Sequence, residues 1–347
     1  MSPRPSRGAA ALLVLVAIAV VAGYLYGSNR GGSSEPPSSQ APVKAHPRQS
    51  SREAAQRASL GAALQHGVDA AAALGGSAEA AIMLDGWPTP LIASSEAHGE
   101  GRFMRMWSMS KVSTMIAVLR GLDWGRRPGQ PISPELDEAL HGAITRSENC
   151  RQRRVVLELQ RLSGGAPAAR RALQDVFRGA GAEVRVGTQI APPEENCLEY
   201  LETQTELAEP LAPALLLGTS TWRVGDAVRL VHALSIGTYG IAISHEVLGL
   251  MRLPKQPSRE VKPGELTAPL NWGAGESLPA KTPYKAGWGG SLNGNFLAGQ
   301  IALADLPGIG HVALVAVFHP DEQPSRDDPG ITEAPQALNA IFSSIGE

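Results

Sequence analysis

A serine and a lysine stand three residues apart in the stretch Ser108-Met109-Ser110-Lys111. The mostly apolar run from Val112 to Leu119 predicts a helix over about 108–122, so both side chains should lie on one helix face. A lysine amine in reach of a serine hydroxyl makes that hydroxyl a nucleophile, and a helix N-terminus favours developing negative charge. The alternative is structural: Ser108 caps the helix and Lys111 is solvated.

Two later triplets favour the chemical interpretation. Ser147-Glu148-Asn149 reads S-x-N, and Lys285-Ala286-Gly287 places a lysine and a glycine at the start of a strand-rich segment. The order S-x-x-K, S-x-N, K-x-G is that of class A β-lactamases and penicillin-binding proteins. The chain therefore resembles this superfamily of penicillin-recognising serine enzymes, and its class A branch most closely, from about Leu60 to Ile345. A second S-x-N triplet at 291–293 is interpreted as hairpin-turn chemistry.

The resemblance implies catalytic roles for four residues. Ser108 would be the nucleophile that forms an acyl-enzyme, and Lys111 its base or proton partner. Ser147 would relay a proton to the leaving nitrogen. Lys285 would supply positive charge to a substrate carboxylate and to Ser147. Two amines that lie this close should each lower the pKa of the other, which a neutral base requires.

The resemblance also implies a substrate-binding set. Asn149 would hold an amide of the substrate, and the backbone N–H groups of Ser108 and Trp288 would form an oxyanion hole. Ala286 stands where the family usually has threonine or serine, so one hydroxyl contact is missing. Gly287 serves either a bulge or close packing, or it leaves room for a ligand. Trp288 and Trp272 could line a substrate cleft or belong to the core.

The sequence departs from the class A pattern at the step that releases the acyl group. Those enzymes deacylate with a glutamate in an E-x-x-L-N pattern, which this chain lacks. Glu194-Glu195-Asn196 is the nearest cluster, and a solvated acidic loop is the favoured interpretation of it. Without a placed general base, an acyl-enzyme should hydrolyse slowly.

The pattern of elements predicts an α+β domain. Two strands over about 78–94 follow a first helix at 54–74. A helical part without a clear strand then extends to about residue 253, and threonine and serine at 219–221 are available to cap one of its helices. Strands at 284–288, 296–304 and 311–318 and a final helix at 334–345 complete the pattern. This matches the family's five-stranded antiparallel sheet flanked by helices, with an all-helical lobe beside it.

The N-terminus predicts a targeting segment. Arg4 and Arg7 precede an uncharged, mostly apolar run from Gly8 to about Gly27, long enough to span a bilayer with the remainder outside. We expect residues 1–27 to be a retained membrane anchor, with a cleaved signal peptide as the alternative. Residues 28–51 read as a flexible Gly/Ser/Pro-rich linker and 52–347 as the hydrolase domain, extracytoplasmic and membrane-anchored or secreted.

Two cysteines and the charge balance complete the picture. In an exported chain Cys150 and Cys197 are expected to form a disulfide, and two buried free thiols are the alternative. A formal net charge of −2 predicts no nucleic-acid partner. The eight histidines show no metal-ligand spacing, so neither a metal nor another cofactor is expected. We expect a monomer.

The sequence thus predicts a serine hydrolase acylated on Ser108. The first hypothesis is a class A-like β-lactamase that opens a cyclic amide. The second is a D-alanyl-D-alanine carboxypeptidase or similar peptidase that acts on cell-wall peptides. The third is a catalytically silent wall-binding module that keeps the fold. The substrate is therefore a small β-lactam or a cell-wall peptide.

Overall fold

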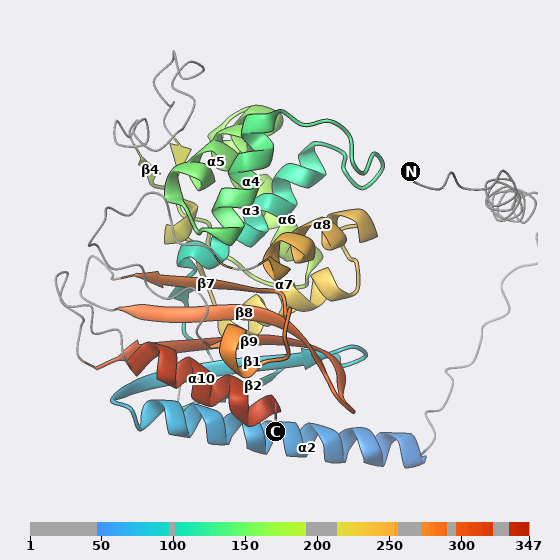
Figure 1. Cartoon of the computed structure of the whole chain (residues 1–347), viewed down its shortest axis with the longest axis vertical. Coiled ribbons are helices and arrows are strands. Elements are labelled where there is room, and N and C mark those ends of the chain that lie inside the picture. The colour runs from blue at the N-terminus through green and yellow to red at the C-terminus, as the bar shows by residue number, and fades with distance from the viewer. Residues whose placement is uncertain are drawn as a thin grey trace, which may run out of the picture. The chain divides into compact units, whose positions relative to one another are not determined.

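The computed structural model describes residues 47–96, 101–191, 214–253, 255, 273–289, 296–321 and 333–346 (Figure 1). The chain divides into two compact units, Met1–Ser51 and Arg52–Glu347, and the second is described below. The predicted membrane segment lies outside the described residues. In the part that is described, no helix is both long enough and apolar enough to cross a membrane.

A five-stranded antiparallel sheet forms the base of this unit, as predicted. Its strands are β1 (Gly76–Leu84), β2 (Leu91–Ser94), β7 (Tyr284–Gly289), β8 (Leu297–Leu306) and β9 (Gly310–Pro320). Their order is β2-β1-β9-β8-β7, so the first hairpin of the chain pairs with its last strand. Successive residues along β1 point to opposite faces of the sheet, so Ala80 lies in one core and Ala81 in the other. β7 is left as an edge strand.

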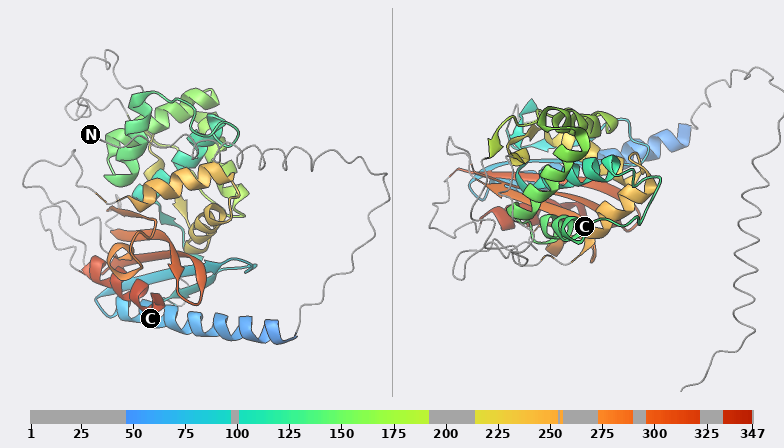
Figure 2. Two further views of the ribbon diagram at one scale, coloured as in Figure 1. Left: turned by 45° about the vertical axis from the view of Figure 1, so that its right-hand side comes forward. Right: turned by 90° about the horizontal axis from the view of Figure 1, so that it is seen from above.

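Two helices cover one face of the sheet. α2 (Pro47–Ala72) and α10 (Glu333–Gly346) lie together beneath it in Figure 1, with apolar side chains of both in one core. The helices approach closely at Gly67, because a Cβ there would lie 2.9 Å from the Cα of Ile341. Figure 2 shows the same layer from two further directions. This layer supports the sheet but contributes none of the predicted site residues.

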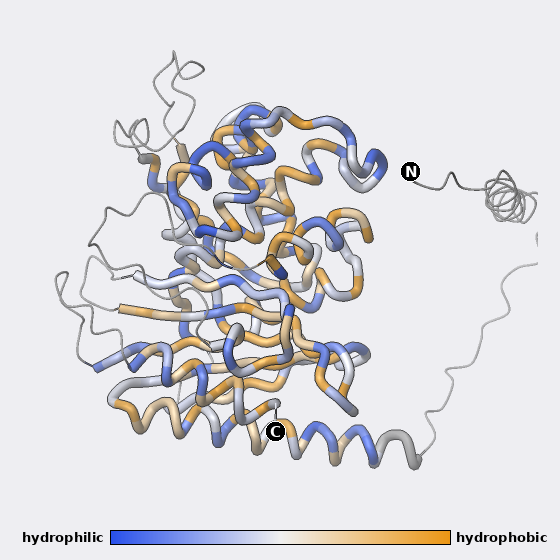
Figure 3. The backbone as a smooth tube through the Cα atoms, viewed as in Figure 1, coloured by the Kyte–Doolittle hydropathy of each residue, from blue (hydrophilic) through white to orange (hydrophobic). Residues whose placement is uncertain are grey.

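The other face of the sheet packs against the helical lobe. Its helices are α3 (Ser110–Gly121), α4 (Pro134–Thr145), α5 (Asn149–Ser163), α6 (Ala166–Gly179), α7 (Val224–Ser235) and α8 (Ile241–Arg252). α3 is central to the lobe, since every residue from Ser110 to Leu119 is buried. α4 starts at the Ser133 cap, and α5 ends at Gly164 with a positive φ of 81°. Hydrophobic segments accordingly gather at the centre of the unit in Figure 3.

The lobe is not wholly helical, which corrects the prediction. β3 (Met104–Arg105) pairs with β6 (Thr221–Trp222), and β4 (Ile190–Ala191) pairs with β5 (Ala214–Leu215). Two-residue strands carry no periodic signal, which is why the sequence did not reveal them. The short helices η4 (Leu217–Thr219) and α9 (Ala274–Ser277) were also not predicted.

The expected capping of α7 is also wrong. Arg223 occupies the N-cap position of α7 and makes no side-chain cap hydrogen bond. Thr221 lies in β6 instead, where its backbone pairs with β3 and with Arg185. Thr221 therefore belongs to the small sheet with β3, which precedes the Ser108 turn, and not to the start of the helix.

Candidate active site

Ser108 lies in a single 3-10 turn, η2 (Trp107–Met109), just before α3, whereas the prediction placed it in the first turn of the α-helix. Trp107 adopts a φ of 45°, which a bulky L-residue rarely does. Such a conformation costs about 1–3 kcal/mol and persists only where neighbours enforce it. Here the Ser110 hydroxyl donates to the Trp107 carbonyl at 2.7 Å. The turn thus presents a half-buried Ser108 at the base of a rigid, buried helix.

Strand β7 presses directly against this turn. A Cβ at Gly287 would lie 2.8 Å from the backbone nitrogen of Met109 and 3.0 Å from that of Ser108. Gly287 therefore allows close packing, one of the two roles considered for it. Gly289 repeats the pattern, since a Cβ there would lie 2.9 Å from the Trp107 ring. At Gly287 the backbones of two segments that are distant in the chain therefore lie in direct contact.

Lys111 is buried in α3 and its amine points to the Ser147 turn. Lys111 Nζ donates to the backbone carbonyl of Ser147, to Ser147 Oγ at 3.4 Å and to Asn149 Oδ1 at 3.1 Å. In the described structure Ser108 Oγ makes no hydrogen bond with this amine, although the residues are one helical turn apart. Catalytic hydrogen bonds are often long before substrate binds, so this geometry leaves Lys111 available to Ser108.

Lys285 contacts the same hydroxyl from strand β7. Its Nζ donates to Ser147 Oγ at 2.8 Å and to the carbonyl of Ala286 at 2.7 Å. Lys285 is 1% exposed. Burial, then the positive charges of Lys111 and Lys255, hold the pKa of the Lys285 amine well below its usual value. The predicted meeting of the three motifs is therefore present, with two amines on one serine oxygen.

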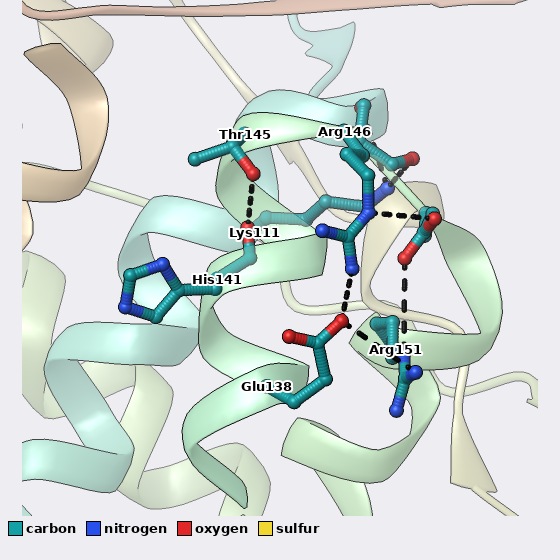
Figure 4. Close-up of polar contacts among 8 residues, drawn as sticks. Lys111, Glu138, His141, Thr145, Arg146 and Arg151 are labelled. Atoms are coloured by element: carbon teal, nitrogen blue, oxygen red, sulfur yellow. Dashed lines mark hydrogen bonds and ion pairs between the residues drawn. The ribbon is translucent and has the colours of Figure 1, made fainter. Parts of the chain in front are cut away.

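The Ser147 turn is held by a buried network of charges. Ser147 has a φ of 58° between α4 and α5, and Figure 4 shows Arg146 and Arg151 gathered beside Glu138. Arg146 Nε donates to Glu148 Oε1 at 2.8 Å, and Arg146 also pairs with Glu138. Arg151 Nε lies 3.8 Å from Glu148 Oε2, and Arg151 Nη2 lies 3.6 Å from Glu138 Oε1.

The electrostatics of this network favour its charged form. Burial lowers the pKa of the Arg146 guanidinium, but its hydrogen bonds to Glu148 and Glu138 outweigh this and leave the pKa above its usual value. Gly142 makes the arrangement possible, because a Cβ there would lie 2.5 Å from Glu148 Oε2. The carboxylates of Glu138 and Glu148 are engaged with arginines and are not placed to activate a water.

The remaining predicted residues lie on α5 and β7. Asn149 begins α5 beside the Lys111 amine. Ala286 is buried in β7, while Trp288 near its end is 39% exposed. The Trp288 ring lies against that of Phe296, with centroids 6.2 Å apart. Since β7 is an edge strand, alternate N–H groups along it have no strand partner, which is what an oxyanion hole needs.

Several predictions fall outside the described residues. These are Cys197, the acidic cluster Glu194-Glu195-Asn196, Trp272 and the second S-x-N triplet at 291–293. Cys150 at the start of α5 has no free thiol and is disulfide-bonded. Its pairing with Cys197 stays a prediction. Across the described segments, no group of three or more His, Cys, Asp or Glu side chains could hold a metal ion.

Two features of the site were missed by sequence reasoning. The arginine–carboxylate network had a visible signal, since Arg146 and Arg151 flank the S-x-N triplet with Glu148 inside it. Lys255, 30 positions before the third triplet, had no such signal, because nothing in the sequence indicates that this lysine lies partly buried against Tyr284.

The arrangement is suited to acyl transfer. A half-buried serine stands at the N-terminal end of a helix, two buried amines flank a second serine, and an edge strand lies against the first. Ser147 can pass a proton between Lys111 and Lys285, because both amines contact its oxygen. What the geometry lacks, among the residues that it describes, is a free carboxylate at this point.

Comparison with known proteins agrees on the fold. No protein-family model matches the chain, and no curated protein sequence matches it. A class A β-lactamase from Bacteroides cellulosilyticus superposes with a TM-score of 0.53 at 14% identity, covering 83% of this chain and 98% of that one. A β-lactamase from Chitinophaga pinensis gives 0.53 at 17% identity, with 82% and 98% covered.

A third solved structure gives the same result. The class A β-lactamase from Mycobacterium abscessus superposes with a TM-score of 0.51 at 14% identity, covering 80% of this chain and 97% of that one. The chain thus has the β-lactamase/penicillin-binding-like fold. At this level of identity the likeness establishes architecture, and activity has to be argued from the site.

Proposed function

We propose that this protein is an extracytoplasmic serine hydrolase that opens cyclic amides of the β-lactam type through an acyl-enzyme on Ser108. The observation that carries the proposal is the convergence of Lys111 and Lys285 on the hydroxyl of Ser147. Two buried lysines whose amines flank one oxygen are costly to fold, so their presence favours a chemical role. The fold of class A β-lactamases supports the same reaction class.

In the proposed acylation, Ser108 Oγ attacks the amide carbonyl carbon while Lys111 takes the hydroxyl proton. The C–N bond then breaks, and Ser147 delivers a proton to the leaving nitrogen. Lys111, which now carries the proton from Ser108, restores the proton of Ser147 across the contact already formed. This step requires Lys111 to start as the neutral amine.

Release of the acyl group is the slow step of this proposal. The two carboxylates nearest Ser147 in the chain, Glu138 and Glu148, are paired with arginines. The sequence lacks the glutamate pattern by which class A enzymes activate water. We therefore expect a burst of acylation followed by slow turnover, with Asn149 and the N–H groups of Ser108 and Trp288 binding the substrate amide and oxyanion.

A peptidase of cell-wall stems is the second candidate, because a long-lived acyl-enzyme and Ala286 in place of a hydroxyl residue are compatible with it. The full-length protein should be incubated with a fluorescent penicillin and, separately, with nitrocefin. Labelling with slow but continuing nitrocefin turnover supports the proposed hydrolase of cyclic amides, and a stable label without nitrocefin turnover supports a peptidase. Absence of both contradicts a hydrolase and leaves a wall-binding module.

The matched control replaces the nucleophile alone. Ser108→Ala should abolish labelling, whereas Ser235→Ala at the end of α7, whose hydroxyl donates to the His232 carbonyl, should retain it. Labelling that survives in Ser108→Ala contradicts the assignment of the nucleophile.

The proposal extends to the ends of the chain. Residues 1–27 would anchor the protein in a membrane, 28–51 would form a tether, and 52–347 would act outside the cytoplasm as a monomer. An exported location is consistent with a disulfide between Cys150 and Cys197, which would tie the start of α5 to the 190s. Non-reducing peptide mass spectrometry tests the pairing, and fractionation of cells tests the anchor.

A further inference from the structure

A cavity of about 540 Å³ lies in the helical lobe between α5 and the loop that joins α3 to α4. Its wall on α5 consists of Arg154, Leu157, Glu158 and Arg161, whose spacing places them on one face of that helix. Residues 130–133 of the loop form another wall. All of these residues are described, and the proposed hydrolase uses none of them.

Hydrogen bonds hold the loop in place without a ligand. The side-chain amide of Gln130 donates to the carbonyl of Leu122 just after α3, and the Gln130 backbone N–H donates to the carbonyl of Arg127 at 3.3 Å. Ser133 Oγ accepts from the Leu136 backbone N–H at 3.2 Å and caps α4. A wall that is fixed in this way loses little conformational freedom when a ligand binds.

Part of the cavity surface is apolar. Leu136 belongs to the hydrophobic core of the lobe, and three further apolar residues pack against that core while they remain partly exposed in the cavity. These are Leu122, Ile132 and Leu157. Covering apolar surface contributes about 25 cal/mol per Å². A cavity of this size, with apolar walls and a few polar groups, is typical of small-molecule sites, so the body of a ligand should be apolar.

The charge at the cavity is not balanced. Arg161 Nε and Nη2 donate to the two carboxylate oxygens of Glu158 at 2.7 and 2.5 Å, so this pair carries no net charge. Arg154 lies earlier on the same face of α5 and is exposed. Within the described residues, its guanidinium forms no ion pair and no hydrogen bond. One net positive charge therefore remains, which favours an anion over a cation.

We propose that this cavity binds a small amphiphilic carboxylate, with its apolar body against Leu122 and Leu157 and its carboxylate at Arg154. A single guanidinium matches one planar carboxylate through two parallel hydrogen bonds, whereas a dianionic group would leave charge unbalanced. This inference goes beyond the proposed hydrolase. Leu122 follows the far end of α3, about 18 Å along the helix from Ser110, so the ligand is not the acylated substrate.

The test compares three naphthalene probes of similar size. 1-Naphthaleneacetate, uncharged 1-naphthaleneacetamide and cationic 1-naphthylmethylamine are each titrated into the full-length protein at pH 7 by isothermal calorimetry. We expect the carboxylate to bind about three- to tenfold more tightly than the amide, and the ammonium to bind most weakly. Arg154→Gln should remove the preference for the carboxylate and leave the affinity for the amide unchanged. The exposed Arg171 on α6 provides the matched control, and Arg171→Gln should keep the preference.

A second kind of variant tests where the probes bind. Ile132→Trp places a larger side chain in the cavity from the loop, and Leu157→Phe does so from α5. Each should weaken the binding of the carboxylate and of the amide alike, because the apolar body loses its space. Thermal melts identify the variants that remain folded.

Several outcomes overturn the proposal. These are no binding of the carboxylate, equal affinity for carboxylate and amide in the wild type, and a preference that survives Arg154→Gln. Unchanged affinities in a folded cavity-filling variant would mean that the probes bind elsewhere, which also overturns it. None of these outcomes depends on whether Ser108 is acylated, so the proposed function and this site are tested separately.

Discussion

On the helical side of the site, the buried guanidinium of Arg146 lies between two carboxylates, and ion pairing keeps it charged. On the sheet side, the amine of Lys285 in β7 and the imidazole of His319 in β9 form no ion pair within the described residues, and burial disfavours their charged forms. The two sides therefore accommodate buried basic groups by opposite means. One pairs a guanidinium with carboxylates, and the other lowers the pKa of an amine and an imidazole.

This difference predicts how the stability of each side responds to mutation and to pH. A buried ion pair is insensitive to pH near neutrality, but the loss of one partner leaves an uncompensated charge. A buried neutral base tolerates the loss of its neighbours better, but it couples stability to pH because the unfolded chain binds a proton that the folded chain does not. Loss of one charged partner should therefore destabilise the helical side most, and acidification should destabilise the sheet side most.

The largest expected effect is on the helical side. Glu148→Gln leaves Arg146 with only the partly exposed Glu138, and we expect the free energy of unfolding to fall by about 3–5 kcal/mol. Labelling of Ser108 should fall with it, because the Ser147 turn loses its support. Urea titration at pH 7 measures the loss.

The matched control for this change is Glu158→Gln on α5. Glu158 pairs with Arg161, whose side chain is 67% exposed, and a surface pair of this kind contributes little. If the two variants are equally stable, the network beside Ser147 is not a structural support, and the contrast between the two sides fails.

On the sheet side, the second prediction concerns the loss of stability at low pH. Burial, and then the charge of Arg102, lower the pKa of His319 to about 4, against about 6.5 in an unfolded chain. As the pH falls from about 6.5 to 4, the unfolded chain gains a proton first, so the folded state loses up to about 3 kcal/mol. In His319→Gln this part of the loss should disappear.

Urea titrations at pH 7 and pH 4.5 measure that difference. The exposed His245 supplies the control, and His245→Gln should retain the wild-type loss between these pH values. An equal loss in His319→Gln and the wild type would mean that His319 is protonated in the folded protein.

The third prediction concerns the contact between the two sides. Gly287→Ala places a Cβ within 3.0 Å of three backbone atoms of the Ser108 turn, and no side chain there can move away. We expect a loss of about 1–3 kcal/mol and a larger loss of acylation, because the nucleophile is displaced. Gly249→Ala on α8 is the control, since its Cβ would meet nothing within 4 Å and a helical alanine is favoured.

The sequence predicted the sheet side better than the helical side. Strands with alternating or continuous apolar residues, such as β1 and β9, carry a signal along the chain, and their extents were close to those observed. The three motifs also predicted which residues converge. Neither the strained φ of Trp107 nor the 3-10 turn could be foreseen, because packing of β7 against the turn enforces them.

The parts that could not be predicted depend on burial across distant segments. Arg146 and Arg151 read as ordinary surface residues until the fold buries them against Glu138 and Glu148. Lys255 reads as a loop lysine until it meets Tyr284. A sequence gives the type and spacing of charges, but desolvation, which decides their pKa, depends on the assembled fold.

The smallest expected effect is the pH dependence of stability that Lys285 contributes, and it tests directly whether the two sides differ in how they bury basic groups. The pKa of the Lys285 amine lies well below that of an unfolded lysine, so in part of the alkaline range the unfolded chain binds a proton that the folded chain does not, and stability should rise with pH. Lys285→Met should make that slope smaller, and the exposed Lys281→Met should not. Glu148→Gln should be less stable at every pH but run parallel to the wild type, because Arg146 does not titrate there. If the plot of stability against pH for Lys285→Met also runs parallel to that of the wild type, Lys285 is charged in the folded protein. Both sides of the site would then bury charged groups.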